Sequence, residues 1–277
     1  MPELPEVEAA CRQLEPYLAD QEIVRVDLRR PDLRSPFPRR FRARLEGQTV
    51  DSLTRRAKYL LATLSSHETL LMHLGMSGSF RVDLPEDATV DRRAAPAGLH
   101  DHVVFRMASG VVVTFNDPRR FSLMDLLTPR QLTRHPVLRR LGPEPLSAAF
   151  DAAALARACR GKKVALKLAL LDQRVVAGLG NIYASEALHV AALSPFRRAS
   201  TIATLSGTPR DSAVRLVRAI KRALAEAIDR QMRDDRSSRF RVYDREGEPC
   251  PRARCGGIVR RRSQAGRSTF YCSVCQK

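Results

Sequence analysis

The chain has 277 residues, enough for two domains, and 44% of them are hydrophobic, so it can bury real cores. Its formal net charge of +18 and its pI of about 10.7 predict a polyanionic partner, either nucleic acid or, as the less favoured alternative, an anionic membrane surface. The sequence shows no apolar run of about 18 residues and no signal peptide, so we expect a soluble, cytoplasmic protein.

The first 128 residues predict one helix followed by a series of short strands. An apolar face at helical spacing runs through residues 5–19 and consists of Val7, Ala10, Cys11, Leu14 and Leu18. Short apolar or alternating runs predict strands at residues 24–28, 60–64, 69–74, 79–82, 102–107 and 111–115. Because no long helix interrupts them, we expect an antiparallel β-sandwich or flattened barrel with a leading helix, and a polar surface loop at residues 85–98.

From residue 129 onward the pattern becomes helical. Residues 129–146 predict a linker with a short helix, and Gly142-Pro143-Glu144-Pro145 marks the domain boundary. Residues 147–235 predict a helical domain whose first helix is capped by Ser147 and ends near Cys159. Further helices are predicted at residues 165–171, 182–190 and 209–233, before a loop at residues 234–239.

The C-terminus holds two pairs of cysteines at metal-ligand spacing. Four residues separate Cys250 from Cys255, and two separate Cys272 from Cys275. This spacing predicts a zinc finger over residues 241–277 with one structural Zn²⁺, because four thiolates leave no open position for catalysis. The alternative is four free thiols or disulfides. The segment between the pairs is rich in arginine, which is typical of a hairpin that binds nucleic acid.

The first six residues, Met1-Pro2-Glu3-Leu4-Pro5-Glu6, form a candidate catalytic group. If Met1 is removed, the Pro2 nitrogen is a free secondary amine that can attack an electrophilic carbon and form an iminium. Glu3 and Glu6 supply carboxyl groups that would move protons during this chemistry. The alternative is that Pro2 and Pro5 only begin a helix, since proline is favoured at the first helical position.

A glycine-rich turn precedes one of the predicted helices. In Gly178-Leu179-Gly180-Asn181 the two glycines permit an unusual backbone path, and Asn181 is placed to cap the helix that follows. The free N–H groups of that helix, with Lys162 and Lys167 upstream, predict two turns between helices that bind a DNA backbone. The alternative is an ordinary glycine turn before a capped helix.

Two loops between strands combine apolar and basic residues. Met76 lies in Gly75-Met76-Ser77-Gly78, while Arg119 and Phe121 lie in Asp117-Pro118-Arg119-Arg120-Phe121. Next to an arginine, Met76 and Phe121 are typical of a wedge that enters DNA where a base has been flipped out. The alternative is that both are core residues. Lys58, beside Arg55 and Arg56, is by itself only a solvated charge.

Together these segments resemble the formamidopyrimidine-DNA glycosylase branch of the Fpg/Nei family of bifunctional DNA glycosylases and abasic-site lyases. The resemblance runs in the same order from residue 2 to residue 277. It rests on Pro2–Glu8, Arg56–Leu60, His73–Gly78, Asp117–Phe121, Gly178–Glu186 and the terminal cysteines.

The resemblance implies an enzyme of base-excision repair that removes an oxidised purine and then cuts the abasic strand by β,δ-elimination. Pro2 would attack C1′ of the sugar and form the Schiff base, and Glu3 would donate a proton at the sugar. Lys58 would donate the proton for β-elimination, and Arg267 would serve δ-elimination and hold a phosphate. Since the iminium is itself the electron sink, no catalytic cofactor is expected.

The resemblance also implies how DNA is bound. Arg119 matches the position that pairs with the orphaned base, and Met76 and Phe121 match those that fill the gap. The other implied DNA-contacting residues are His73, His100, Lys162, Lys167 and Asn181. The expected partner is damaged double-stranded DNA, bound by a monomer associated with the nucleoid in the cytoplasm.

Two other functions remain open at this point. One is an endonuclease VIII-like specificity for oxidised pyrimidines on the same scaffold. The other is a non-catalytic DNA-binding zinc-finger protein. The presence of Pro2, Glu3 and Lys58 favours the enzyme, because a protein that only binds DNA has no need of a processed N-terminal proline.

The sequence departs from the family pattern at two places. The first cysteine pair encloses four residues where the family commonly has two, which predicts a longer knuckle around the same metal. Residues 234–240 are fewer than in the family loop that closes over a flipped 8-oxoguanine. We therefore expect better relative activity on formamidopyrimidines or further-oxidised guanine products than on 8-oxoguanine.

Overall fold

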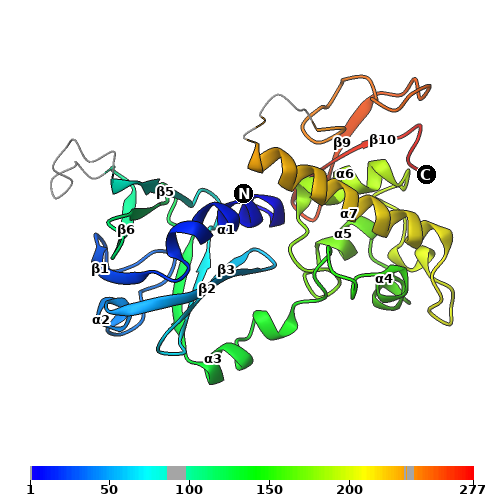
Figure 1. Cartoon of the computed structure of the whole chain (residues 1–277). Helices are drawn as coiled ribbons and strands as arrows, with labels where there is room; N and C mark the ends of the chain where they lie inside the picture. The colour runs from blue at the N-terminus through cyan, green and yellow to red at the C-terminus, as the bar shows by residue number, and fades with distance from the viewer. Residues whose placement is uncertain (1, 86–97, 234, 236–239) are drawn as a thin grey trace. The chain divides into compact units, whose positions relative to one another are not determined.

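The computed structural model describes residues 2–85, 98–233, 235 and 240–277 (Figure 1). The chain divides into two units. Pro2 and residues 6–139 belong to the first unit, and Glu3–Pro5 with residues 140–277 belong to the second. Each unit has its own cluster of buried apolar side chains.

The first unit is an antiparallel sheet preceded by a helix. Helix α1 (Leu4–Leu18) leads into eight strands: β1 (Glu22–Leu28), β2 (Gln48–Arg56), β3 (Tyr59–Leu64), β4 (Thr69–His73), β5 (Ser79–Asp83), β6 (Asp101–Met107), β7 (Val112–Asn116) and β8 (Leu123–Leu127). Their order is β5-β7-β6-β1-β2-β3-β4-β8. Strands β1 and β2 are joined by only two residue pairs, so the sheet consists of two four-stranded halves. Among the described residues this order has two ends, β5 and β8, which are not hydrogen-bonded to each other.

The apolar face predicted for the first helix is confirmed. Val7, Cys11, Leu14 and Leu18 of α1 are all buried in the core of the first unit. Pro16 lies inside the helix and α1 ends two residues later, in agreement with the loss of a backbone donor near its end.

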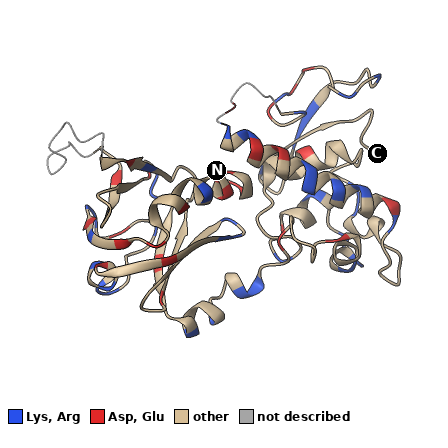
Figure 2. Ribbon diagram, in the orientation of Figure 1, with Lys and Arg blue, Asp and Glu red and all other residues tan. Residues whose placement is uncertain are grey.

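The second unit is helical and ends in a hairpin. Its helices are α4 (Ala152–Cys159), α5 (Leu166–Leu171), α6 (Asn181–Val190) and α7 (Asp211–Met232), and its hairpin consists of β9 (Val259–Gln264) and β10 (Arg267–Cys272). Helix α7 packs on α6 through an apolar face that includes Leu216, Ile220 and Leu224, all completely buried. Figure 2 shows that Lys and Arg are spread over helices, strands and loops of both units.

Two predicted helix caps are corrected. Asp151, not Ser147, caps α4, because the Asp151 carboxylate accepts from the backbone N–H of Ala154 at 2.7 Å. The Ser147 hydroxyl instead donates to the carbonyl of Glu144. At α6 the N-cap is Gly180, and Asn181 is the first helical residue.

The predicted fold class is confirmed: an antiparallel sheet with a leading helix, a helical second half and a terminal hairpin. The elements that were not predicted are strands β2 and β8, the short helix α2 (Phe41–Leu45) and the 3-10 helix η3 (Ala199–Ile202). The predicted linker helix is α3 (Pro129–Arg134), which Thr128 and Gln131 close with a capping box. The loops predicted at residues 85–98 and 234–239 lie almost entirely outside the described residues. Among the helices of the described chain, none combines the length and apolar character needed to cross a membrane.

Candidate functional site

The candidate residues are distributed over both units. The first unit contains Pro2, Glu6, Lys58, His73, Met76, His100, Arg119 and Phe121. The second contains Glu3, Lys162, Lys167, Asn181, Arg267, Cys250, Cys255, Cys272 and Cys275.

The carboxylate of Glu3 is bound to the N-terminus of α6. Its two oxygens accept from the backbone N–H groups of Ile182 at 2.9 Å and Tyr183 at 3.4 Å, and the residue is only 2% exposed. A negative charge is favoured at a helix N-terminus, where the first N–H groups lack helical partners. Glu3 therefore occupies the N–H groups of Ile182 and Tyr183, so a phosphate at this helix end cannot accept from these two.

The glycine-rich turn is shaped to receive residues 3–5. A Cβ at Gly180 would lie 2.2 Å from the carboxyl carbon of Glu3, and a Cβ at Gly178 would lie 2.7 Å from Cδ1 of Leu4. Gly178 also has a φ of +79°. The Leu4 N–H donates to the carbonyl of Gly178 at 3.3 Å. The two glycines are therefore required because the chain's first residues approach their backbone so closely.

Lys167 is a buried cation that holds the terminal hairpin. Its side chain is 0% exposed, and its ammonium donates to the carbonyl of Ser268 at 2.9 Å and to the Thr269 hydroxyl at 2.7 Å. Burial, followed by the charge of Arg267, lowers the pKa of Lys167 to about 8. The structure leaves this side chain no surface for a DNA contact, so the prediction that Lys167 contacts DNA is corrected.

Asn181 binds the same carbonyl of the hairpin. Its side-chain amide donates to Ser268 O at 2.9 Å, so the carbonyl of Ser268 accepts from Lys167 and Asn181 together. Ser268 directly follows Arg267, whose exposed side chain begins β10. Both contacts thus fix the backbone next to Arg267. Lys162, the other predicted DNA contact in this unit, is half-buried just after α4.

In the first unit, one buried carboxylate joins the two loops that carry the predicted wedge. Asp117 is 0% exposed and accepts from the Ser77 hydroxyl at 2.5 Å, from the Arg119 N–H at 3.2 Å and from the Ser122 N–H at 2.9 Å. Burial by itself raises the pKa of Asp117, but hydrogen bonds from Ser122 and Ser77 outweigh it and hold this pKa below its usual value. Asp117 therefore ties the loop at residues 75–78 to the loop at residues 117–122.

The wedge residues themselves are exposed. Met76 is 39% and Phe121 is 46% exposed, and the Arg119 guanidinium lies 4.9 Å from the centre of the Phe121 ring. A Cβ at Gly75, which has a φ of +61°, would lie 2.4 Å from the backbone of Phe121, so the two loops are in close contact. Large exposed apolar side chains beside a cation suit insertion into a base stack.

His73 lines a pocket of about 410 Å³ beside the wedge, together with Arg34, Gly75, Met76 and Phe121. Its Nδ1 accepts from the Gly75 N–H at 3.0 Å, which leaves the proton on Nε2. Burial, followed by the charges of Lys58 and Arg34, lowers the pKa of His73 to about 4. His73 is thus a neutral donor at pH 7.

The remaining candidates of the first unit are half-buried. Lys58 occupies the two-residue turn between β2 and β3, and Glu6 lies in the first turn of α1. His100 precedes β6, and its carbonyl accepts from the Asp117 N–H at 3.0 Å. Pro2 immediately precedes the buried Glu3, so the position of its backbone depends on how Glu3 is held.

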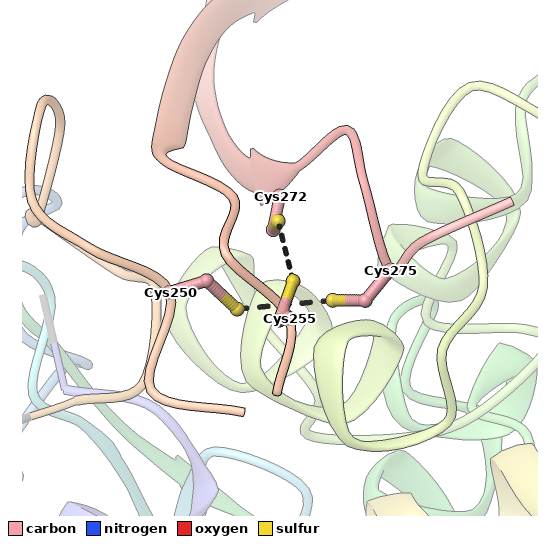
Figure 3. Close-up of side chains that lie close together, drawn as sticks. All are labelled: Cys250, Cys255, Cys272 and Cys275. Carbon is pink, nitrogen blue, oxygen red and sulfur yellow. Dashed lines mark hydrogen bonds between the residues drawn. The ribbon is translucent and has the colours of Figure 1, made fainter. Parts of the chain in front are cut away.

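The four terminal cysteines form a metal site (Figure 3). Their Sγ atoms all lie within 4.8 Å of one another, with 3.8 Å between Cys250 and Cys275 and 3.5 Å between Cys255 and Cys272. Four Zn–S bonds of about 2.3 Å in a tetrahedron place the sulfurs about 3.8 Å apart. The cysteines therefore fit one structural Zn²⁺, and the prediction of a zinc site at these residues is confirmed.

Three functional residues were not predicted from the sequence. Asp117 belongs to the segment Asp117–Phe121 that resembles the family, but no role was predicted for it. Glu186 is buried and accepts from the backbone N–H groups of residues 241–243 at 2.8–3.0 Å, which fixes the chain before the zinc finger. His189 lies against a zinc ligand, with its Nε2 3.3 Å from the sulfur of Cys250. For Glu186 and His189, the signal in the sequence was an ionisable residue within a largely apolar part of the predicted helix.

Comparison with known proteins finds similar proteins along the whole chain. Residues 1–124 match the formamidopyrimidine-DNA glycosylase N-terminal domain, residues 141–238 match the H2TH domain of that glycosylase, and residues 247–277 match a zinc finger found in FPG and IleRS. The formamidopyrimidine-DNA glycosylases of Bradyrhizobium diazoefficiens and Azorhizobium caulinodans are 55% and 53% identical to this chain, each with complete coverage of both sequences.

Solved structures show the same likeness. The formamidopyrimidine-DNA glycosylase of Lactococcus lactis, bound to DNA with an abasic site, superposes with a TM-score of 0.85 at 30% identity. MutM in complex with DNA containing carbocyclic 8-oxoguanine superposes with a TM-score of 0.84 at 29% identity. Both comparisons cover all of this chain and all of the other.

Proposed function

Because the chain belongs to the formamidopyrimidine-DNA glycosylase family, we propose that it is a base-excision repair enzyme that removes oxidised purines from DNA and cuts the abasic strand. The observation that carries this proposal is the match to glycosylases along the full length of both chains at 55% identity. The Pro2-Glu3 start and the net charge of +18 support it, because the reaction needs an amine nucleophile and a polyanionic substrate.

The reaction begins at the N-terminal amine. After removal of Met1, the Pro2 nitrogen forms a bond to C1′ of the damaged nucleotide, and the bond from C1′ to the base breaks. The electron pair of that bond leaves with the base, which takes up a proton. Glu3 donates a proton to the sugar ring oxygen as the ring opens, which gives the iminium. The buried hydrogen bonds of Glu3 to α6 support this role, because they hold the carboxyl group in one position.

Strand cleavage follows from the iminium, which accepts electrons from the sugar. The C2′ proton is lost to solvent, the bond from C3′ to the 3′ phosphate breaks, and the phosphate leaves with the electron pair. Lys58 donates a second proton, to the departing phosphate, in this β-elimination. A second elimination, served by Arg267, breaks the bond to the 5′ phosphate. Water then hydrolyses the Schiff base and restores the Pro2 amine. Glu6, in the first turn of α1, is proposed to assist these proton transfers.

DNA binding is assigned to residues that the structure leaves accessible. Arg119 pairs with the base left without a partner, and Met76 and Phe121 fill the gap left by the flipped nucleotide. Their exposure and the hydrogen bond between Ser77 and Asp117 that joins their loops support this assignment. Phosphate contacts are proposed for His73, His100, Lys162 and Asn181.

The organisation and setting of the protein are proposed on the same basis. We assign residues 1–128 to a catalytic sheet domain, 129–146 to a linker, 147–235 to the helical DNA-binding domain and 241–277 to the zinc finger. A monomer is proposed because one molecule must bend one duplex. Cytoplasmic location at the nucleoid follows from the DNA substrate.

The short segment at residues 234–240 is proposed to shift lesion preference towards formamidopyrimidines or further-oxidised guanines. Relatives have been crystallised with DNA containing Fapy-dG or an 8-oxoguanine analogue. Single-turnover excision of both lesions opposite cytosine measures the preference. Equal or faster excision of 8-oxoguanine would contradict this part of the proposal.

Borohydride trapping on a duplex with 8-oxoguanine or an abasic site tests the proposed activity. Borohydride reduces the iminium to a stable amine, so the wild-type protein should become covalently attached to DNA. Pro2→Gly and a form that retains Met1 should give little adduct. An exchange of Asp51, an exposed residue of β2, to Asn serves as the matched control. Tight, salt-sensitive binding without an adduct or strand cleavage would instead indicate a non-catalytic DNA-binding protein.

A further inference from the structure

The longer knuckle of the zinc finger is docked on the C-terminal end of α6. Arg252 lies between the first two cysteines, and its guanidinium donates to the carbonyls of His189 at 2.5 Å and Val190 at 3.2 Å. The last carbonyls of a helix lack helical partners and carry partial negative charge, so a cation is stabilised there. Arg252 thus fixes the knuckle to the last turn of α6.

The second knuckle is attached to the same region. Gln276 is 4% exposed, and its side-chain amide donates to the carbonyl of Leu193, just beyond α6. The side-chain oxygen of Gln276 accepts from the Cys272 N–H at 2.8 Å. Both halves of the zinc site are therefore held by one stretch of chain, residues 189–193.

His189 makes the direct link between this stretch and the zinc ligands. It belongs to the last turn of α6, is 3% exposed, and its Nε2 lies 3.3 Å from the sulfur of Cys250. In a four-cysteine zinc site each sulfur is a thiolate, which accepts hydrogen bonds and cannot donate them. The proton of a neutral imidazole must then be on Nε2 for the contact to be favourable.

The surroundings of the other ring nitrogen, Nδ1, also favour a proton on Nε2. Nδ1 of His189 is buried and has no hydrogen-bond partner among the described residues. A proton on Nδ1 would leave a buried donor unpaired and would place the Nε2 lone pair against a thiolate. With the proton on Nε2, only the Nδ1 lone pair is left without a partner and the thiolate gains a donor, so the proton is favoured on Nε2.

We propose that His189 is an outer-shell residue of the zinc site that donates its Nε2–H to the Cys250 thiolate, and that Arg252 positions Cys250 for this bond. The hydrogen bond withdraws charge from the sulfur, which makes the thiolate less reactive towards protons and electrophiles. The proposal also gives the longer knuckle a function, because Arg252 is one of its four intervening residues. It concerns zinc retention and does not depend on the proposed enzymatic activity.

Transfer of zinc from the full-length protein to a colorimetric chelator tests the proposal. His189→Phe fills the buried space without a donor, and Arg252→Met keeps the side-chain length without the charge. Both should release zinc about 10–100-fold faster than the wild type, since outer-shell partners commonly contribute this much to metal affinity. Arg254→Met is the matched control, because Arg254 lies exposed in the same knuckle, and it should release zinc at the wild-type rate.

The absorption of the Co²⁺-substituted protein provides a second readout that is independent of activity and of release kinetics. Loss of the hydrogen bond should shift the sulfur-to-cobalt charge-transfer band of His189→Phe, and His189→Gln, which restores an N–H donor, should return it towards the wild-type position. An unshifted band in His189→Phe would overturn the hydrogen bond. Wild-type release from both His189→Phe and Arg252→Met, or equally fast release from Arg254→Met, would overturn the proposal.

Discussion

The buried carboxylate of Asp117 offers the sharpest test of how the wedge is held. Asp117→Asn keeps the shape of the side chain but replaces one acceptor oxygen with an NH₂ group. If the amide keeps its oxygen towards Ser77 and Arg119, the NH₂ group meets the Ser122 N–H, and two donors face each other. If the amide is turned, the Arg119 N–H loses its bond to Asp117 and retains only the Ser77 hydroxyl at 3.3 Å.

One backbone donor therefore loses an acceptor whichever way the amide is oriented. Loss of a buried acceptor costs about 1–3 kcal/mol, so we expect Asp117→Asn to lower the free energy of unfolding by about that amount. Because hydrogen bonding lowers the folded-state pKa of Asp117, its ionised form stabilises the fold fully above about pH 4. This stabilisation is lost as pH falls through the folded-state pKa, so the difference between wild type and variant should shrink in acid.

Two measurements are combined in the assay. Denaturant unfolding at several pH values gives the change in stability. The ratio of lesion excision opposite cytosine to excision opposite adenine reports on Arg119, whose backbone Asp117 holds. We expect the ratio for Asp117→Asn to fall towards that of Arg119→Ala. Ser77→Ala, which removes the bond between the two loops, should act in the same direction.

Asp51→Asn is the control, because Asp51 is exposed on β2 of the same unit. If Asp117→Asn matches this control in both stability and opposite-base ratio, the reasoning that Asp117 preorganises the wedge is refuted. A loss of stability with an unchanged ratio would restrict Asp117 to a structural role.

Three further predictions concern the second unit. Gly180→Ala should displace the Glu3 carboxylate, whose carbon would lie 2.2 Å from the new Cβ, and slow single-turnover excision by about 10²–10⁴-fold; unchanged excision would contradict a role for Glu3. The depressed pKa of Lys167 predicts that wild-type stability rises with pH between about 8 and 10.5, because the unfolded chain binds more protons there; denaturant unfolding of Lys167→Met should lack this rise. Chelation of zinc should abolish tight DNA binding in a fluorescence anisotropy titration, and added Zn²⁺ should restore it; binding that survives metal removal would separate the zinc finger from DNA recognition.

Features fixed by local spacing could be predicted from the sequence. The face of α1 and the strands with alternating apolar residues follow from the periods of helix and strand. The zinc ligands follow from the spacing of the cysteines. Strand β2 could not be predicted in the same way, because only Val50 and Leu53 of its nine residues are buried and the rest are largely polar.

Features fixed by distant residues could not be predicted. Asn181 is a good cap by composition, but the Glu3 carboxylate, 179 residues before Ile182, binds the N–H groups of Ile182 and Tyr183. Lys167 has the local pattern of a phosphate contact, yet its partners lie in the hairpin more than 100 residues later. Ser147 and Asp151 are both suitable N-caps by residue type. Tertiary packing decides between them, since Phe150, next to Asp151, is fully buried in the core of the second unit.

The bond between Glu3 and α6 also has a consequence for the order in which the protein folds. It joins residues 179 apart in sequence, and closing so long a loop is entropically costly, so such contacts form slowly. On the ribosome the N-terminal residues emerge first and must wait until residues 181–183 have been synthesised. We therefore expect the nascent chain to acquire its sheet core early and to remain inactive until a late step, when α6 forms and Glu3 binds to it.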